Sequence, residues 1–303
     1  MNVMIRNRIR LYTFAGSLVL QTLAVYAQTQ PPSAPPAYKN ATDTAAQNRM
    51  HSFYAGTGGG NNMLYLGSTM SQGHGFGFAS VSYGLMDKIY FSATGYTVNK
   101  LSPFTAFYSL GLSFNHTFNS WFDISAGFSR YNVSAPLRDT LFDNFSYADV
   151  TLGFDWKILY SKISAGSLFS GDKQFYLQTR HSRYFETPSF AGGKAFFSFD
   201  PYINILSGTV VSIETSGDVK ETTVSPGFRP WRKKRQGSNP SPVTTYNEYF
   251  GLMEIDFGFP AAFSYDFFTI ELEPGYVIPL YSLEGSSGTG GFLFMASLFL
   301  KIF

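Results

Sequence analysis

Two pairs of carboxylates stand at alternating positions near the C-terminal end of the chain. Glu254 and Asp256 form the first pair, and Glu271 and Glu273 form the second. Because strand side chains two residues apart point to the same face, each pair would share a face, and neighbouring strands in register would join all four into an acidic ridge. Such a ridge predicts a cation-attracting constriction, since rings of carboxylates select cations.

A structural network is the alternative use of these carboxylates. Narrow barrels fill their interiors with side chains, and the space left for a pathway grows with the number of strands. Arg180 and Lys157 are available as basic partners, with Gln178 and Ser182 on the same face as Arg180. Further carboxylates would extend the network: Asp123, Asp149 and Asp155. Packing and conduction both stay open, and in either case we expect these side chains to line the lumen.

A run of basic residues surrounds Trp231 in the loop 226–242. The run consists of Arg229, Arg232, Lys233, Lys234 and Arg235. On the outside of the cell these side chains could hold lipopolysaccharide phosphates through charge-assisted hydrogen bonds. The alternative is a solvated loop without a ligand.

Catalysis, metal binding and nucleic-acid binding find no support in the composition. The chain has no cysteine, which excludes disulfides and thiolate metal sites. None of the four histidines stands where it would pair with Ser or Asp for catalysis; His116 should face outward, and His181 and Ser182 point to opposite faces of one strand. The net charge of +2 gives no electrostatic case for nucleic acid. We therefore expect no enzyme, no cofactor and no metal.

Alternating polarity predicts the strands that position these side chains. From about residue 61 the chain consists of segments of roughly ten residues separated by turn-forming residues. Twelve can be placed, at about 63–71, 75–85, 88–98, 105–117, 121–131, 144–156, 161–169, 174–184, 195–215, 246–258, 266–280 and 292–303. Strand numbers of 10 or 14 remain open, with an even number expected. Pro201 and Pro274 fall inside segments, and since proline cannot donate to a ladder, we expect a bulge or a strand end at Pro274.

The composition favours a membrane barrel over a soluble one. The chain contains 32 Phe, 20 Tyr and 29 Gly, and only 14% of its residues are charged, against about 25% in soluble domains. In the segment 246–258, Met253 and Ile255 belong to the apolar set that alternates with Glu254 and Asp256. A transmembrane antiparallel β-barrel accounts for these features, because only every second residue of each strand must be apolar.

The first 60 residues are expected to precede the barrel. Residues 1–27 carry three arginines, an apolar run and a small residue at Ala27, which is the order of a secretory signal peptide; the alternative is a transmembrane anchor. Residues 28–60 are rich in Pro, Ala and Gly, which predicts a flexible periplasmic lead-in. The barrel would then occupy 61–303.

The turns and the C-terminus resemble a known class. The Gly-Leu-x-Asp-Lys turn at 84–88, the aromatic turn Phe-Asn-Ser-Trp-Phe at 118–122 and the terminal Leu-Lys-Ile-Phe are similar to Gram-negative outer-membrane barrel proteins of the porin and small-transporter kind. The resemblance implies outer-membrane lipid as surroundings and recognition of Phe303 by the barrel-assembly machinery. In this chain Lys301 shares its phase with Phe303, and the apolar stripe is Phe294, Ala296, Leu298, Leu300 and Ile302.

Loop lengths give the orientation and the expected function. With both chain ends in the periplasm, the long loops 132–143 and 216–245 lie outside. We expect a passive pore or small-solute transporter whose lumenal charges set its selectivity. The alternative is a non-conducting structural or surface-interaction barrel that acts through the loop 216–245.

Overall fold

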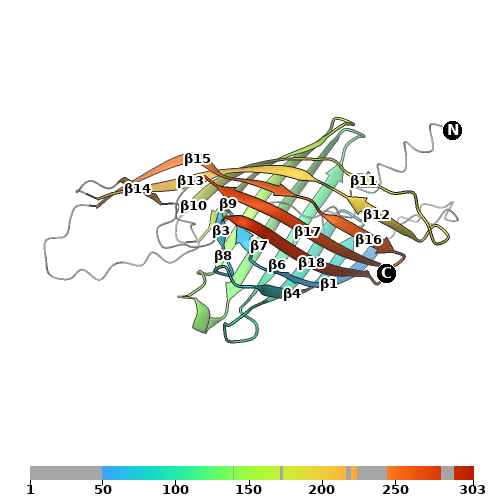
Figure 1. The fold of residues 1–303 in the computed structure, drawn as a ribbon, viewed down its shortest axis with the longest axis horizontal. Helices are drawn as coiled ribbons and strands as arrows, with labels where there is room; N and C mark the ends of the chain where they lie inside the picture. The colour runs from blue at the N-terminus through green and yellow to red at the C-terminus, as the bar shows by residue number, and fades with distance from the viewer. Residues whose placement is uncertain (1–49, 139, 171–172, 216–219, 224–243, 281–289) are drawn as a thin grey trace.

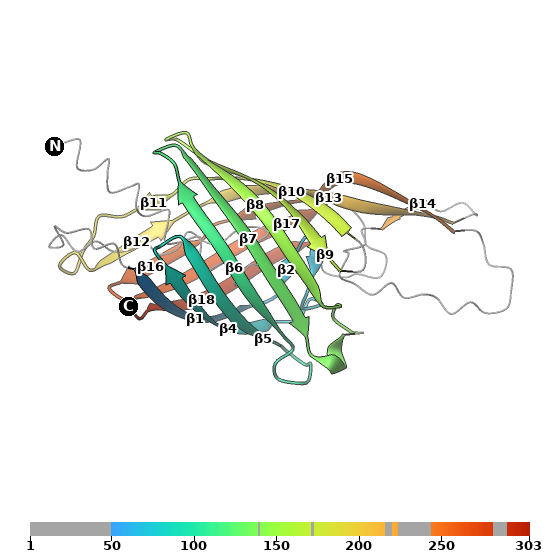
Figure 2. The same cartoon turned by 180° about the vertical axis from the view of Figure 1, so that it is seen from behind.

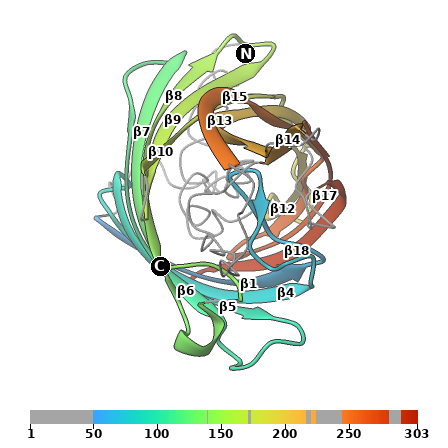
Figure 3. The same cartoon turned by 90° about the vertical axis from the view of Figure 1, so that its left-hand side faces the viewer.

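Antiparallel strands close into a 12-stranded barrel, which confirms the predicted fold class (Figure 1). The computed structural model describes residues 50–138, 140–170, 173–215, 220–223, 244–280 and 290–303. Each barrel strand pairs with its neighbour, and β18 pairs with both β17 and β1, which closes the ring (Figure 3). The barrel strands are β1 (His51–Gly60), β4 (Phe76–Leu85), β5 (Ile89–Val98), β6 (Phe107–Thr117), β7 (Phe122–Val133), β8 (Phe145–Asp155), β9 (Tyr160–Phe169), β10 (Lys173–Ser182), β13 (Tyr202–Thr215), β15 (Thr244–Gly258), β17 (Phe268–Pro279) and β18 (Gly291–Lys301).

Shorter elements complete the described fold. They are β2 (Leu64–Tyr65), β3 (Ser68–Thr69), β11 (Phe185–Glu186), β12 (Ala195–Phe199), β14 (Lys220–Thr223), β16 (Ala261–Tyr265) and the 3-10 turn η1 (Ala135–Leu137). Strand β14 pairs with β13, whereas β11, β12 and β16 extend the wall at the end of the barrel that carries the C-terminus (Figure 1). Among the described residues, no helix has the length and apolar character needed to cross a membrane.

The wall carries its apolar face outside and its polar face inside. On β6, Tyr108, Leu110, Leu112 and Phe114 are 42–50% exposed, whereas Ser109 and Ser113 between them are at most 3% exposed. A soluble barrel has the reverse arrangement, since each Å² of apolar surface left in water costs about 25 cal/mol. The outer face therefore suits contact with lipid, as in transmembrane barrels.

The first barrel strand begins earlier than the sequence predicted. Residues 51–60 form β1, which pairs with β4 and β18, so their assignment to the lead-in is wrong. The strand is difficult to recognise because its glycines lack side chains, yet the glycines have a packing role. A Cβ added at Gly56 or Gly58 would overlap the rings of Phe299 and Phe78 respectively. Those two rings supply the apolar bulk that β1 lacks.

The segment predicted as the strand 63–71 instead folds into the lumen. Its β2–β3 hairpin turns at Leu66 and Gly67, whose φ angles of 50° and 75° suit a tight two-residue hairpin turn. Met63, Tyr65 and Met70 are at most 2% exposed, and the blue hairpin lies within the ring of strands in Figure 3. The prediction of a wall strand is wrong because these apolar side chains are buried inside the barrel rather than against lipid.

Three prolines lie at the same level of the wall, and two of them interrupt strands. Pro201 separates β12 from β13, and Pro260 separates β15 from β16. The carbonyls of both, and that of Pro274, accept backbone hydrogen bonds across the breaks, from Arg183 at 3.1 Å, Asp200 at 3.1 Å and Phe259 at 2.9 Å respectively. Strand β17 runs through Pro274 without the predicted bulge or end, since this proline lies opposite the break between β15 and β16.

The two ends of the barrel differ in their connections. We call the end where β1 begins and β18 ends the terminal end, and the opposite end the loop end. Most connections at the terminal end are short: 86–88, 118–121, 156–159 and 266–267, with the connection 187–194 as the exception. Apart from 170–172, those at the loop end are longer and include 61–75, 99–106 and 134–144. The predicted signal peptide and residues 28–49 of the lead-in lie outside the described residues.

Candidate functional site

The four carboxylates of the predicted acidic ridge lie on the inner face of the wall. Glu254 and Asp256 come from β15, and Glu271 and Glu273 come from β17, which pairs with β15 and then with β16. Each is 1–3% exposed. The structure therefore places all four on one inner face, as predicted, but not in register, because Glu254 and Asp256 pair with Pro279 and Val277 rather than with Glu271 and Glu273. We use the name acidic ridge for these four.

A β-bulge sets the direction of Glu254. The register of β13 with β15 shifts between Leu206, which pairs with Glu254, and Ser207, which pairs with Leu252. Met253 is the extra residue of the bulge. As a result Met253 and Glu254 are both buried, whereas Leu252 is 43% exposed. The prediction that Met253 faces outward is wrong, because the bulge reverses the alternation at this point.

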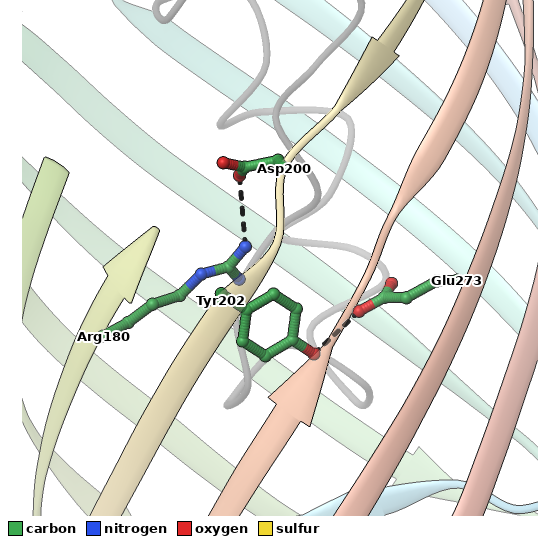
Figure 4. Close-up of polar contacts among 4 residues, drawn as sticks. All are labelled: Arg180, Asp200, Tyr202 and Glu273. Carbon is green, nitrogen blue, oxygen red and sulfur yellow. Dashed lines mark hydrogen bonds and ion pairs between the residues drawn. The ribbon is translucent and has the colours of Figure 1, made fainter. Parts of the chain in front are cut away.

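Arg180 connects the ridge to the neighbouring strands (Figure 4). Its guanidinium is 2% exposed and lies 3.3 Å from the Asp200 carboxylate. The same guanidinium lies 3.7 Å from the centroid of the Tyr202 ring, as a cation–π contact. The Tyr202 hydroxyl donates a 2.8 Å hydrogen bond to Glu273. Side chains from β10, β13, β17 and the β12–β13 break thus form one continuous chain of contacts.

Two local features make this chain of contacts possible. Asp200 occupies the break before Pro201, outside both β12 and β13, so its carboxylate can turn toward Arg180. Gly258 stands on β15 between Tyr202 and the ridge, and a side chain at that position would overlap the Tyr202 ring. Without a side chain at Gly258, the ring can cross β15 and reach Glu273 on the next strand.

Asp123 and Asp149 lie apart from the ridge, on β7 and β8 across the ring (Figure 3). Asp123 accepts a 2.9 Å hydrogen bond from Tyr160, and the Lys162 ammonium lies 5.5 Å from the centroid of the same ring. Asp149 accepts a longer one, 3.4 Å, from Thr151. Both carboxylates therefore have hydroxyl donors of their own.

Asp155 and Lys157 lie at the end of β8 and in the turn that follows it. The Lys157 side chain is exposed, and its φ of 72° places it in the turn between β8 and β9. Asp155 accepts a 2.7 Å hydrogen bond from the Lys157 backbone, which is a turn contact. The prediction that Lys157 is a lumenal partner is wrong, because the strand ends before it; Lys162 on β9, opposite Arg180, takes that place.

The β2–β3 hairpin reaches the ridge from the loop end. Its tip residue Gly67 stands against Met253, whose Cε would lie 2.8 Å from an added Cβ. The Glu254 carboxylate accepts a hydrogen bond from the Gly67 backbone. At the base of the hairpin, the Asn62 side-chain oxygen accepts hydrogen bonds, one of them 2.7 Å from Thr69. The hairpin is thus fixed at both ends and narrows the lumen beside the ridge.

The remaining predicted residues lie elsewhere. Phe303 stacks on Phe53 at 5.8 Å, at the terminal end, and the basic run Arg229, Arg232, Lys233, Lys234 and Arg235 lies outside the described residues. His181 does not pair with Ser182, as expected, but hydrogen-bonds to Ser161 across strands at 2.8 Å. Ser161 also accepts from the Trp156 indole at 3.1 Å. Within the described part of the chain, no three His, Asp or Glu side chains gather closely enough to hold a metal ion.

Several residues of the site escaped the sequence analysis. Asp200, Tyr202 and Asn204 lie in the predicted segment 195–215, which was treated as one continuous strand, and Lys162 was not singled out. The Asp-Pro pair at 200–201 was the available signal of a strand break, since the residue before proline is restricted in its backbone. At such a break the Asp200 side chain can point into the lumen. The contacts between strands carry no such signal in the sequence.

Comparisons with known proteins give matches of low similarity. No protein-family model and no curated protein sequence matches the chain. Among solved structures, the NanC porin covers 82% of this chain with all of its own length, at 10% identity and a TM-score of 0.46. The KdgM porin (11% identity, TM-score 0.43) and LpxR from Salmonella typhimurium (9%, 0.43) also cover 82% of this chain, with 98% and 99% of their own lengths. At these values nothing about this chain's solute or partners follows from the matches.

Proposed function

We propose that this chain is an outer-membrane channel that admits small cationic solutes, with its terminal end toward the periplasm. One observation carries the proposal: the acidic ridge and Asp200 place five buried carboxylates on the inner wall, and Arg180 forms an ion pair with Asp200. The five carboxylates outnumber the basic side chains described beside them, Arg180 and Lys162. Their surplus negative charge attracts cations and opposes anions.

Reconstitution into planar bilayers tests this function. Under a tenfold KCl gradient we expect discrete conductance steps. The sign of the reversal potential should show that K⁺ permeates in preference to Cl⁻. In the E254Q/E271Q variant, which keeps size and hydrogen bonding, the reversal potential should move toward zero. The control D87N removes a carboxylate from a turn at the terminal end, at a φ of 53° that asparagine tolerates, and should behave like wild type.

The lumenal hairpin favours a second function, a non-conducting structural or surface-interaction barrel. Met63, Tyr65 and Met70 occupy space inside the ring, and the hairpin tip contacts Glu254. A bilayer that stays sealed with wild type and also with a variant lacking residues 63–71 would support this alternative. Conductance that rises when the hairpin is removed would instead show that it narrows a working pore.

Two contacts with the surroundings belong to the same proposal. The basic run from Arg229 to Arg235 would bind lipopolysaccharide phosphates from the outer leaflet. Phe303, just after β18, would be recognised by the barrel-assembly machinery during insertion. Neither role needs a cofactor or a catalytic residue.

A further inference from the structure

We infer that the acidic ridge is a binding site for a small organic cation that carries two or more separated amino groups. The inference rests on the proposed function, because it names the class of solute that such a channel would recognise. Its basis is a set of buried acceptor atoms, their distribution over three strands, and the way in which the same wall already holds one basic group.

Five buried side-chain oxygens on this wall have no hydrogen-bond donor. Each belongs to a residue that is at most 6% exposed. They are Asp200 Oδ1, Asn204 Oδ1, Asp256 Oδ1, Glu271 Oε1 and Glu273 Oε2. A buried acceptor without a donor costs about 1–3 kcal/mol, and more when it is charged. A ligand that brings N–H donors and positive charge would remove this cost.

Asn204 points to a ligand independently of the carboxylates. It is fully buried, and its amide nitrogen donates a 2.7 Å hydrogen bond to Asp256 Oδ2. This bond fixes the orientation of the amide, so that its oxygen and the second Asp256 oxygen remain as acceptors side by side on paired strand positions. A neutral acceptor next to a carboxylate offers nothing to an anion and suits an ammonium group, which has three donors.

The spread of the acceptors favours an extended ligand over an inorganic ion. The oxygens come from β17, β15 and β13 with the break before it, three neighbours in the wall whose adjacent strands lie about 4.8 Å apart. Because Asp256 pairs with Val277, Glu273 also lies four residues farther along β17, about 13 Å at the usual rise of a strand. Among the described residues no three acidic or histidine side chains converge on one point, as a divalent metal requires. A chain with amino groups at its two ends can place a donor at each strand.

Arg180 shows how this wall receives a basic group. Its guanidinium pairs with Asp200 at 3.3 Å and lies over the Tyr202 ring at 3.7 Å. Tyr202 in turn donates to Glu273 Oε1 and leaves Oε2 without a donor. A carboxylate and an aromatic face together attract a cation through charge and cation–π contact. Beside the pair that holds Arg180, the same wall has further acceptor oxygens without donors.

Isothermal titration of the purified full-length barrel in detergent tests the inference. The probes are spermidine and 1,4-diaminobutane, with butylamine as the single-charge match and Mg²⁺ as the compact divalent match. We expect saturable binding of both polyamines, and at least tenfold weaker binding of butylamine and of Mg²⁺. The D256N/E271Q variant should bind spermidine at least tenfold more weakly, while D87N should bind it like wild type. Heat-modifiable gel mobility verifies that each variant is folded.

The outcomes separate this inference from the proposed function. Absence of saturable polyamine binding to wild type, or equal affinity for Mg²⁺, overturns the assignment of the ligand class, even where bilayer steps confirm a channel. Unchanged spermidine affinity in folded D256N/E271Q overturns the location of the site. Polyamine binding by a protein that leaves bilayers sealed supports the site and overturns the channel.

Discussion

The barrel has two kinds of wall, which differ in regularity and in how their inner carboxylates are hydrogen-bonded. We call β4–β9 the regular wall, because its strands run 10 to 12 residues without interruption (Figure 2). The interrupted wall, β10–β17, contains the breaks at Pro201 and Pro260 and the bulge at Met253. Irregular backbone therefore coincides with the acidic ridge and Arg180, as bulges commonly accompany functional sites.

The inner faces of the two walls also differ in chemistry. Asp123 and Asp149 on the regular wall each accept a hydrogen bond from a nearby hydroxyl, and many other inner positions are small, such as Ser82 and Ser113. The interrupted wall instead holds buried carboxylate oxygens that lack donors, on Asp200, Asp256, Glu271 and Glu273. Under the proposed function, we expect the regular wall to close the barrel and the interrupted wall to recognise the solute.

Replacement of Arg180 should have the largest effect on stability. The R180M variant keeps apolar volume but leaves Asp200 buried without its cation, which we expect to cost about 3–5 kcal/mol in unfolding free energy. Urea unfolding of the protein in lipid vesicles measures the loss. The same replacement at Lys100, which is exposed at the loop end, should change stability little.

A double variant checks the cause of this loss. R180M/D200N removes both charges, and it should recover a large part of the stability, because an apolar pair tolerates burial better than a single charge. A double variant as unstable as R180M would contradict the assignment of Asp200 as the main partner.

Alanine at Gly258 should have the next largest effect. The new Cβ would overlap the Tyr202 ring, so the ring must move, and its hydrogen bond to Glu273 is lost; overpacking of this kind costs about 1–3 kcal/mol. Gly95 on the regular wall is the matched control, since a Cβ there meets no atom within 4 Å. Equal unfolding free energies for G258A and G95A would refute the role of Gly258.

How far the sequence predicts this molecule depends on which wall is considered. Strict alternation predicted β6, β7 and β8 with their faces, because regular strands repeat every two residues. It also placed the acidic ridge on one face. The alternation could not show the bulge at Met253 or the inward turn of Asp200, since both depend on pairing between strands far apart in the chain.

The glycine-rich β1 and the lumenal hairpin were misassigned for a related reason. Periodicity measures side-chain character, and β1 has little of it where Gly58, Gly59 and Gly60 follow one another. The hairpin has strong apolar character, but its apolar side chains are buried inside the barrel instead of facing lipid. In both cases the position of the segment in the fold depends on its surroundings more than on its own residues. For β1 these surroundings are the rings of Phe299 and Phe78, and for the hairpin they are the interior of the barrel.

Serine substitutions on the two walls should give the smallest effects. Ser264 on β16 shares a 3.0 Å hydrogen bond with Thr269, and S264A should cost about 1 kcal/mol through loss of that bond. The Ser82 hydroxyl on β4 is buried without a hydrogen-bond partner, so S82A removes no bond and should stay within about 0.5 kcal/mol of wild type. Urea unfolding in vesicles compares the two. If S82A were the more damaging variant, the Ser82 hydroxyl would have a hydrogen-bond partner, contrary to its surroundings in the structure.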